Sequence, residues 1–180
     1  MRPSRRSRPD VRHIALLVIG SVLLLSPLAP AAAGADTPAP AAYRAAPEFA
    51  RVDLEHRQVS LADYRGKVVL LNFWATWCAP CLAEVRRFAE WQRSYGPRGL
   101  QVVGVSMDDE EPPVRAAYQR YGLNYPVVMG DEKLGALYGG VLGLPVTFLI
   151  DGNGKIRFQH QGATDLNIIE REIQGLLPGR

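Results

Sequence analysis

Hydrophobic and polar positions along this chain change from one period to another, and each change predicts a new element. The run from Val68 to Trp74 is almost entirely apolar and rich in β-branched and aromatic residues, which predicts a strand buried on both faces of a sheet. Apolar residues then recur at helical spacing from Cys78 to Tyr95, at Leu82, Val85, Phe88 and Ala89. A buried strand therefore runs, after a short turn, into an amphipathic helix.

The rest of the chain alternates between the same two patterns. Upstream, two short strands flanking E-H-R predict a β-hairpin, at Phe49 to Leu54 and Gln58 to Leu61. Downstream, strands are predicted at Leu100 to Met107, Tyr125 to Met129, Val146 to Ile150 and Lys155 to His160. Helices are predicted at Pro113 to Tyr121 and at Asp165 to Leu177, the second with Thr164 as its N-cap. The alternation indicates an α/β fold with right-handed crossovers.

The N-terminal residues have the composition of a secretory leader. Met1 to Arg12 contains five arginines and one aspartate, and the apolar stretch Ile14 to Leu25 is followed by small residues. The A-x-A pattern ending at Ala35 predicts cleavage there, with Ala33 as the second choice. The apolar run is short for a membrane-spanning helix, although an uncleaved N-terminal anchor is the alternative. Either one places the following domain outside the cytoplasm.

The composition divides the chain into three segments. Residues 1–35 form the leader or anchor, residues 36–47 a proline- and alanine-rich linker, and residues 48–180 one folded domain. The chain has a net charge of +3, and the leader contributes +4 of it, so the remainder carries −1. Nucleic-acid binding needs a basic face on the folded domain, and this charge balance gives no reason to expect one.

The chain contains two cysteines, Cys78 and Cys81, at the predicted start of the helix. Pro80 between them suits the first turn of a helix, where a backbone N–H has no partner in any case. Unpaired N–H groups and the helix dipole stabilise a thiolate at Cys78, which makes it a nucleophile at neutral pH. Cys81, one turn further on, can attack a mixed disulfide at Cys78 and release the partner.

Two other interpretations of the cysteine pair are an inert structural disulfide and half of a zinc site. A zinc site needs two further ligands. The chain has no other cysteine, and its histidines are scattered, at His13, His56 and His160. A redox-active disulfide is therefore the favoured interpretation, and no metal or other cofactor is expected.

The stretch F-W-A-T-W-C-A-P-C resembles the active site of thioredoxin-fold proteins, in particular the exported TlpA/ResA-like thiol-disulfide oxidoreductases, which include the CcmG (DsbE) proteins. The resemblance extends from about Pro47 to the C-terminus. Thioredoxin has a buried aspartate six residues before its first cysteine, where this chain has Asn72, whereas TlpA/ResA-like proteins have a glutamate at the position of Glu84. The resemblance implies a thioredoxin fold: a central mixed β-sheet flanked by helices, with an N-terminal β-hairpin extension.

The family likeness also implies roles for particular residues. Glu84 is expected to exchange protons with Cys81, although an exposed helical glutamate is the alternative interpretation from the sequence alone. The family implies a cis peptide bond before Pro145, which leaves the backbone of Leu144 free to pair with an extended substrate segment. Trp77 and Pro80 complete the expected substrate-binding residues.

Two positions depart from the family pattern. Arg86 stands where a proline is common, and Val146 follows Pro145 where CcmG-like members usually have an acidic residue. The resemblance implies reduction of apocytochrome c or copper-centre disulfides, with electrons from a membrane thiol reductant of the CcdA/DsbD type. A disulfide oxidase, a Sco-like copper-delivery module and a peroxidase are alternatives. Sco proteins have a C-x-x-x-C pair, one residue longer than the pair in this chain.

Overall fold

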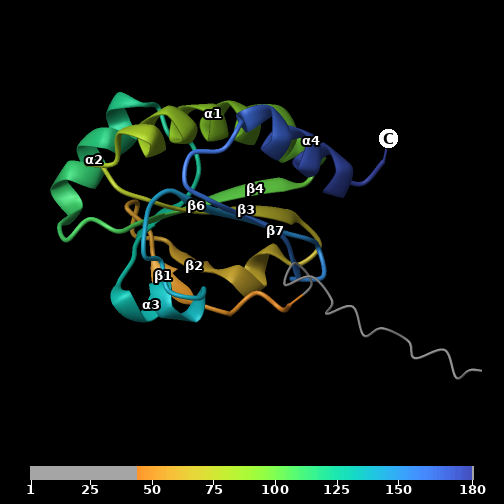
Figure 1. The fold of residues 1–180 in the computed structure, drawn as a ribbon, viewed down its shortest axis with the longest axis horizontal. Coiled ribbons are helices and arrows are strands. Elements are labelled where there is room, and N and C mark those ends of the chain that lie inside the picture. Colours follow the sequence, from red (N-terminus) through yellow and green to blue (C-terminus); the bar gives the residue numbers. More distant parts are fainter. Residues whose placement is uncertain (1–43, 180) are drawn as a thin grey trace, which may run out of the picture. The chain divides into compact units, whose positions relative to one another are not determined.

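The structure, a computed structural model, describes residues 44–179. The predicted leader and residues 36–43 of the predicted linker lie outside the described residues. A five-stranded sheet in the order β5-β4-β3-β6-β7 forms the centre of the domain (Figure 1). Its strands are β3 (Val68–Trp74), β4 (Leu100–Ser106), β5 (Val127–Met129), β6 (Val146–Ile150) and β7 (Ile156–Gln161).

The sheet is mixed, as predicted. β3, β4 and β5 run parallel to one another, whereas β6 is antiparallel to both β3 and β7. All seven residues of the central strand β3 are buried. Leu70 and Trp74 belong to one hydrophobic cluster, whereas Leu71 and Phe73 belong to another on the opposite face. The continuous apolar run in the sequence is thus explained by burial on both faces.

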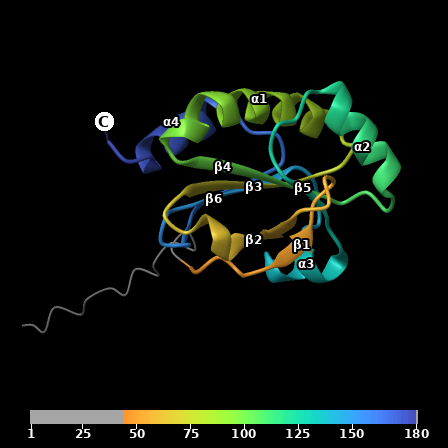
Figure 2. The same cartoon turned by 180° about the vertical axis from the view of Figure 1, so that it is seen from behind.

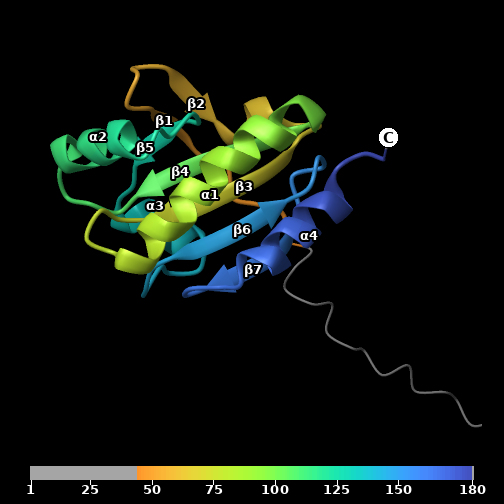
Figure 3. The ribbon, with the colours of Figure 1, turned by 90° about the horizontal axis from the view of Figure 1, so that it is seen from above.

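Helices cover one face of the sheet. α1 (Ala79–Tyr95), α2 (Glu111–Arg120) and α4 (Leu166–Leu176) lie on this side (Figures 1 and 2). Seen from above, α1 runs over the middle of the sheet and α4 lies towards its β7 edge (Figure 3). On the other side lie α3 (Glu132–Leu137) and the antiparallel hairpin of β1 (Ala50–Val52) and β2 (Gln58–Ser60). None of the helices within residues 44–179 is long and apolar enough to cross a bilayer.

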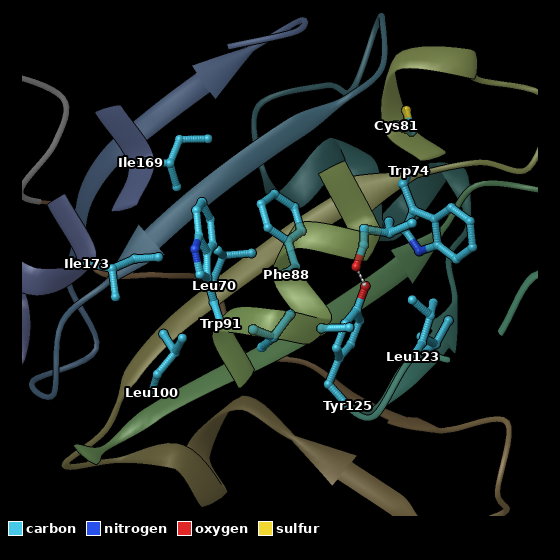
Figure 4. Close-up of a cluster of buried hydrophobic side chains, with 14 of the residues drawn as sticks. Leu70, Trp74, Cys81, Phe88, Trp91, Leu100, Leu123, Tyr125, Ile169 and Ile173 are labelled. Carbon is cyan, nitrogen blue, oxygen red and sulfur yellow. Dashed lines mark hydrogen bonds between the residues drawn. The ribbon is translucent and has the colours of Figure 1, made fainter. Parts of the chain in front are cut away.

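The core beneath α1 holds the active-site helix in place. Phe88 and Trp91 of α1 stack at 5.4 Å between ring centroids, and Ile169 and Ile173 of α4 are fully buried beside them (Figure 4). The buried hydroxyl of Tyr125 donates a hydrogen bond of 3.3 Å to the Val85 carbonyl of α1. This hydrogen bond ties the middle of α1 to the segment that leads into β5.

Most elements agree with the sequence prediction in kind and order, and several details differ; β5, for example, begins at Val127, two residues after the predicted start. α2 begins at Glu111, two residues before the predicted start. The prediction of Thr164 as N-cap of α4 was wrong: the Asp165 carboxylate caps the helix by accepting a hydrogen bond from the Asn167 backbone N–H. α3 is a helix that the sequence pattern did not predict. Finally, the last residues of the predicted linker pack on the domain, where the Ala46 N–H donates to the Gly154 carbonyl.

Candidate active site

Cys78 and Cys81 form a disulfide whose Cα atoms are 5.3 Å apart. Cys78 is the N-cap residue of α1, and Pro80 occupies the first turn, as predicted. The accessibility of the two cysteines differs. Cys78 keeps 6% of its surface exposed, whereas Cys81 is completely buried. An incoming sulfur can therefore approach Cys78, and Cys81 is shielded beneath it.

The start of α1 favours negative charge on Cys78. A helix N-terminus presents unpaired N–H groups and the positive end of the helix dipole. The first turn of α1 contains no acidic residue, so no carboxylate there offsets this positive potential. The geometry therefore lowers the cost of a thiolate at Cys78 once the disulfide is reduced.

Glu84 lies on the same helix, three residues after Cys81, and its side chain is buried. Residues at this spacing are neighbours on a helix surface. Burial raises the pKa of the Glu84 carboxyl to about 7, and an interaction with the Thr164 backbone offsets part of that effect. Its Oε2 atom has no hydrogen-bond partner within the described residues. The structure therefore rules out the exposed-glutamate interpretation and leaves a carboxyl that can gain or lose a proton near neutral pH.

Asp108 holds the loop that leads into the disulfide, a role that the sequence analysis missed. Its carboxylate accepts hydrogen bonds from the Thr76 N–H at 2.9 Å, the Thr76 hydroxyl at 2.5 Å and the Ser106 hydroxyl at 2.7 Å. Asp108 is buried although it begins the sequence D-D-E-E. Acidic residues ahead of a helix commonly complement the helix dipole. In the structure, Asp108 instead bridges the end of β4 and the loop before Cys78.

Trp77, the residue before Cys78, and Leu144 line the same cavity. The Trp77 side chain is 70% exposed, and both residues line an apolar cavity of about 300 Å³ with Met107, Val141 and Leu142. The peptide bond between Leu144 and Pro145 is cis, as the family resemblance implied. Within residues 44–179, the backbone N–H and carbonyl of Leu144 make no hydrogen bond. Trp77 and Pro80 are exposed and Leu144 is half-buried, so these three predicted substrate-contacting residues are accessible, whereas Pro145 is buried.

The other residue singled out in the sequence, Asn72, lies buried in the middle of β3. Its side-chain amide donates a hydrogen bond of 3.0 Å to the Thr147 hydroxyl of β6, directly opposite in the sheet. Its Oδ1 atom has no partner within the described residues. Asn72 thus cannot supply the carboxyl that thioredoxin has at this position, which leaves Glu84 as the buried acid on the active-site helix.

A disulfide at the start of a helix, on a mixed sheet flanked by helices, defines a thiol-disulfide oxidoreductase of thioredoxin fold. Known proteins agree with this class. A profile of the AhpC/TSA family matches residues 43–159. ResA thiol-disulfide oxidoreductases from Geobacillus thermodenitrificans and Bacillus subtilis are 38% and 32% identical over 74% of this chain and 76% and 75% of theirs. The chain belongs to the AhpC/TSA family and to the ResA-like thiol-disulfide oxidoreductases.

Solved structures show the same fold. A candidate DsbE thiol:disulfide interchange protein from Chlorobium tepidum has a TM-score of 0.70 and 33% identity, over 76% of this chain and 97% of that protein. A thiol-disulfide oxidoreductase from Bacteroides vulgatus matches through its thioredoxin domain, with a TM-score of 0.65 and 26% identity, over 73% of this chain and 97% of that domain. The predicted thioredoxin fold is therefore confirmed.

Proposed function

We propose that this protein is exported and reduces disulfides in other exported proteins through the Cys78–Cys81 pair. The observation that supports this most directly is the difference between the two cysteines: Cys78, the N-cap of α1, keeps 6% of its surface exposed, and Cys81 keeps none. A reductant needs one sulfur to attack the substrate and a second, protected one to complete the reaction.

The reaction proceeds in two exchanges. The Cys78 thiolate attacks one sulfur of the substrate disulfide, a mixed disulfide forms, and the other substrate sulfur leaves as a thiolate. The Cys81 thiolate then attacks the Cys78 sulfur and releases the first substrate sulfur. Two electrons have moved to the substrate, which ends as a dithiol after taking up two protons, and the protein ends with the disulfide seen in the structure.

Glu84 serves as the proton carrier for the buried sulfur. Cys81 must lose its proton before it can attack, because the thiolate is the nucleophile. A buried carboxyl with a pKa of about 7 is well matched to accept that proton at neutral pH. The same carboxyl returns the proton when the disulfide is reduced again.

The substrate segment binds beside Trp77 and Leu144. An extended chain can pair with the free backbone groups of Leu144 and add a short strand there. Trp77 and Pro80 offer exposed surface next to the cysteines, Pro145 is buried behind Leu144 in the chain, and the apolar cavity accepts a neighbouring side chain. The disulfide itself is the redox group, and the mechanism uses no further cofactor.

The sequence supports two further parts of the proposal. The leader-like residues 1–35 direct the domain out of the cytoplasm, either as a cleaved signal peptide or as a membrane anchor. A reductant in an oxidising compartment needs electrons, and a membrane thiol reductant of the CcdA/DsbD type supplies them. The expected targets are the haem-attachment cysteines of apocytochrome c or the cysteines of a copper centre.

Substrate trapping tests the direction and the targets. In a Cys81→Ala variant the second exchange is blocked, so mixed disulfides at Cys78 accumulate and can be isolated from cells. We expect apocytochrome c or copper-site proteins, whose cysteines must be reduced before they bind haem or metal. Recovery of proteins that keep their disulfides would instead indicate an oxidase. Tight Cu(I) binding by the reduced wild-type protein would indicate copper delivery.

A further inference from the structure

A second surface lies on the α1 and α2 side of the disulfide, away from Leu144. A cavity of about 230 Å³ opens between these helices, and its apolar walls come from four side chains: Leu82 of α1 and Pro113, Ala116 and Ala117 of α2. Thr76 lines the same cavity, two residues before Cys78, and Leu82 directly follows Cys81. This α1–α2 groove is therefore lined by close chain neighbours of both cysteines. Both helices lie on the same side of the sheet (Figures 1 and 2).

Two arginines border the groove. The guanidinium groups of Arg86 and Arg120 lie 5.0 Å and 5.6 Å from the centroid of the Tyr121 ring, and both side chains are exposed. Arg120 and Tyr121 also line the groove. Contact with an aromatic ring holds a guanidinium in place but leaves its terminal N–H donors available to an anion. The Arg86 Nε donates a hydrogen bond of 3.4 Å to the Leu82 carbonyl, which leaves its two terminal nitrogens for a ligand.

The neighbouring arginines are neutralised, and these two are not. Arg87 pairs with Glu90 and Glu170, and Arg115 pairs with Glu111. Neither Arg86 nor Arg120 forms an ion pair within residues 44–179. Two positive charges therefore remain uncompensated at the edge of an apolar groove, next to the reactive disulfide.

We propose that the α1–α2 groove binds an acidic segment of the protein whose disulfide is exchanged. An apolar side chain of that segment fills the groove, and adjacent carboxylates bind Arg86 and Arg120. Carboxylates suit these sites because the planar guanidinium matches them with two parallel hydrogen bonds. The proposal rests on the proposed function, and it adds a substrate class: disulfides in proteins with acidic residues near the cysteines.

The exposure of Arg86 and Arg120 determines whether they affect the rate of substrate binding or its affinity. Exposed charges increase the rate of encounter with an oppositely charged partner more than they increase its final affinity. The effect weakens as salt rises, because exposed charges are screened. The signature of the groove is thus a salt-dependent preference for acidic substrates in the first exchange.

Three synthetic peptides test this with the reduced full-length protein. Each carries the same internal disulfide, flanked by Leu-Glu-Glu, Leu-Gln-Gln or Leu-Lys-Lys. The rate constant of the first exchange is measured by stopped-flow tryptophan fluorescence, since Trp77 adjoins Cys78. At low salt we expect the acidic peptide to react about tenfold faster than the neutral one, and the difference to shrink as salt is added. An Arg86→Gln, Arg120→Gln double variant should lose this preference and reduce the neutral peptide at the wild-type rate.

A matched control removes two exposed arginines elsewhere. Arg93 lies in the last turn of α1 and Arg171 on α4, and an Arg93→Gln, Arg171→Gln variant has the same net charge as the double variant. We expect it to keep the preference. Equal loss in both variants would overturn the groove as the site, since net charge alone would explain the result. Equal slowing of all three peptides by the Arg86 and Arg120 changes would also overturn it.

A separate variant tests the apolar contact in the groove. Ala116 is exposed and lines the groove, so Ala116→Trp fills it without touching the disulfide. We expect this variant to slow the acidic peptide with leucine, and to leave unchanged a version in which serine replaces the leucine. An Ala116→Trp variant that reduces the leucine peptide at the wild-type rate, or slows both peptides equally, would overturn the groove as an apolar subsite. If wild-type protein reduced none of the peptides, the proposed function itself would fail, a result distinct from reduction without preference.

Discussion

The buried carboxyl of Glu84 makes the stability of the fold depend on pH. Its pKa is raised from 4.5 to about 7, so the folded protein keeps the proton longer than the unfolded chain does. Below pH 4.5 both states are protonated, and the group has no effect. Between pH 4.5 and 7 the unfolded state ionises first, which lowers the free energy of unfolding by about 3 kcal/mol in total. Above pH 7 the loss is complete and constant.

A Glu84→Gln variant tests this, because it keeps the shape of the side chain and removes the ionisation. We expect urea unfolding to show a more stable variant at pH 8, by up to about 3 kcal/mol, and little difference at pH 4. The same variant should release mixed disulfides about 100-fold more slowly at neutral pH, because Cys81 loses its proton acceptor. A variant whose stability tracks the wild type at every pH would contradict the burial of an ionisable group here.

Asp108 is expected to act on the reaction through the loop that it holds. Asp108→Ala removes the acceptor of both Thr76 hydrogen bonds and the acceptor of the Ser106 hydroxyl, which keeps only the hydrogen bond from the backbone N–H of residue 108. Because Thr76 lies two residues before Cys78, we expect the loop to shift and exchange to slow by up to about 100-fold. Asp108→Asn can still accept from the Thr76 N–H, and the hydroxyls can rotate to accept from its amide.

The Asn variant should therefore retain most of the rate. Circular dichroism establishes that both variants fold, and the pH dependence of Cys78 alkylation reports the pKa of its thiol. An Ala variant that folds, exchanges at the wild-type rate and keeps the wild-type thiol pKa would show that the loop needs no anchor.

Among the strands, β4 packs tightly against Trp74 at Gly104, where there is no room for a larger residue. A Cβ atom added at Gly104 would lie 3.1 Å from Trp74 Nε1, 3.2 Å from Val127 Cγ2 and 3.4 Å from Tyr125 Cε2. These groups are buried and belong to β3, β5 and the segment that leads into β5, so they can give way only by disturbing the sheet. We expect Gly104→Ala to lower the free energy of unfolding by about 1–3 kcal/mol, measured by urea titration. Gly175→Ala is the control, since a Cβ there meets nothing within 4 Å. Equal stability of the two variants would contradict the tight packing.

The elements that could be predicted from the sequence are those whose own pattern determines their burial. β3 and α1 are correct to within a residue, because six apolar residues among seven consecutive positions, and a helical stripe, each specify one arrangement. α3 could not be found, since its six residues contain a glycine and two charges, and its helical form depends on Asp131 capping it through the Leu134 N–H. In the same way, the sequence pointed to the two cysteines and Glu84, but nothing in it placed Asp108 beside Thr76. That contact joins residues 32 positions apart and arises from the parallel pairing of β3 with β4.

At the scale of the whole molecule, the direction of electron flow is linked to the stability of the fold in its two redox states. Unfolding and reduction form one thermodynamic cycle, so a fold that favours the disulfide over the dithiol lowers the reduction potential of the couple. A reductant should therefore be more stable oxidised than reduced. DsbA, a strong oxidant, has the opposite preference, because its reduced form is the stabilised one.

We expect guanidinium unfolding of this protein to require more denaturant when Cys78 and Cys81 are joined than after reduction with dithiothreitol. Each 30 mV by which the fold lowers the potential corresponds to about 1.4 kcal/mol of extra stability in the oxidised form. A Cys78→Ser, Cys81→Ser variant is the control, and dithiothreitol should leave its unfolding midpoint unchanged. A reduced protein more stable than the oxidised one would reverse the proposed direction and make this chain an oxidase, while leaving the fold and the exchange chemistry intact.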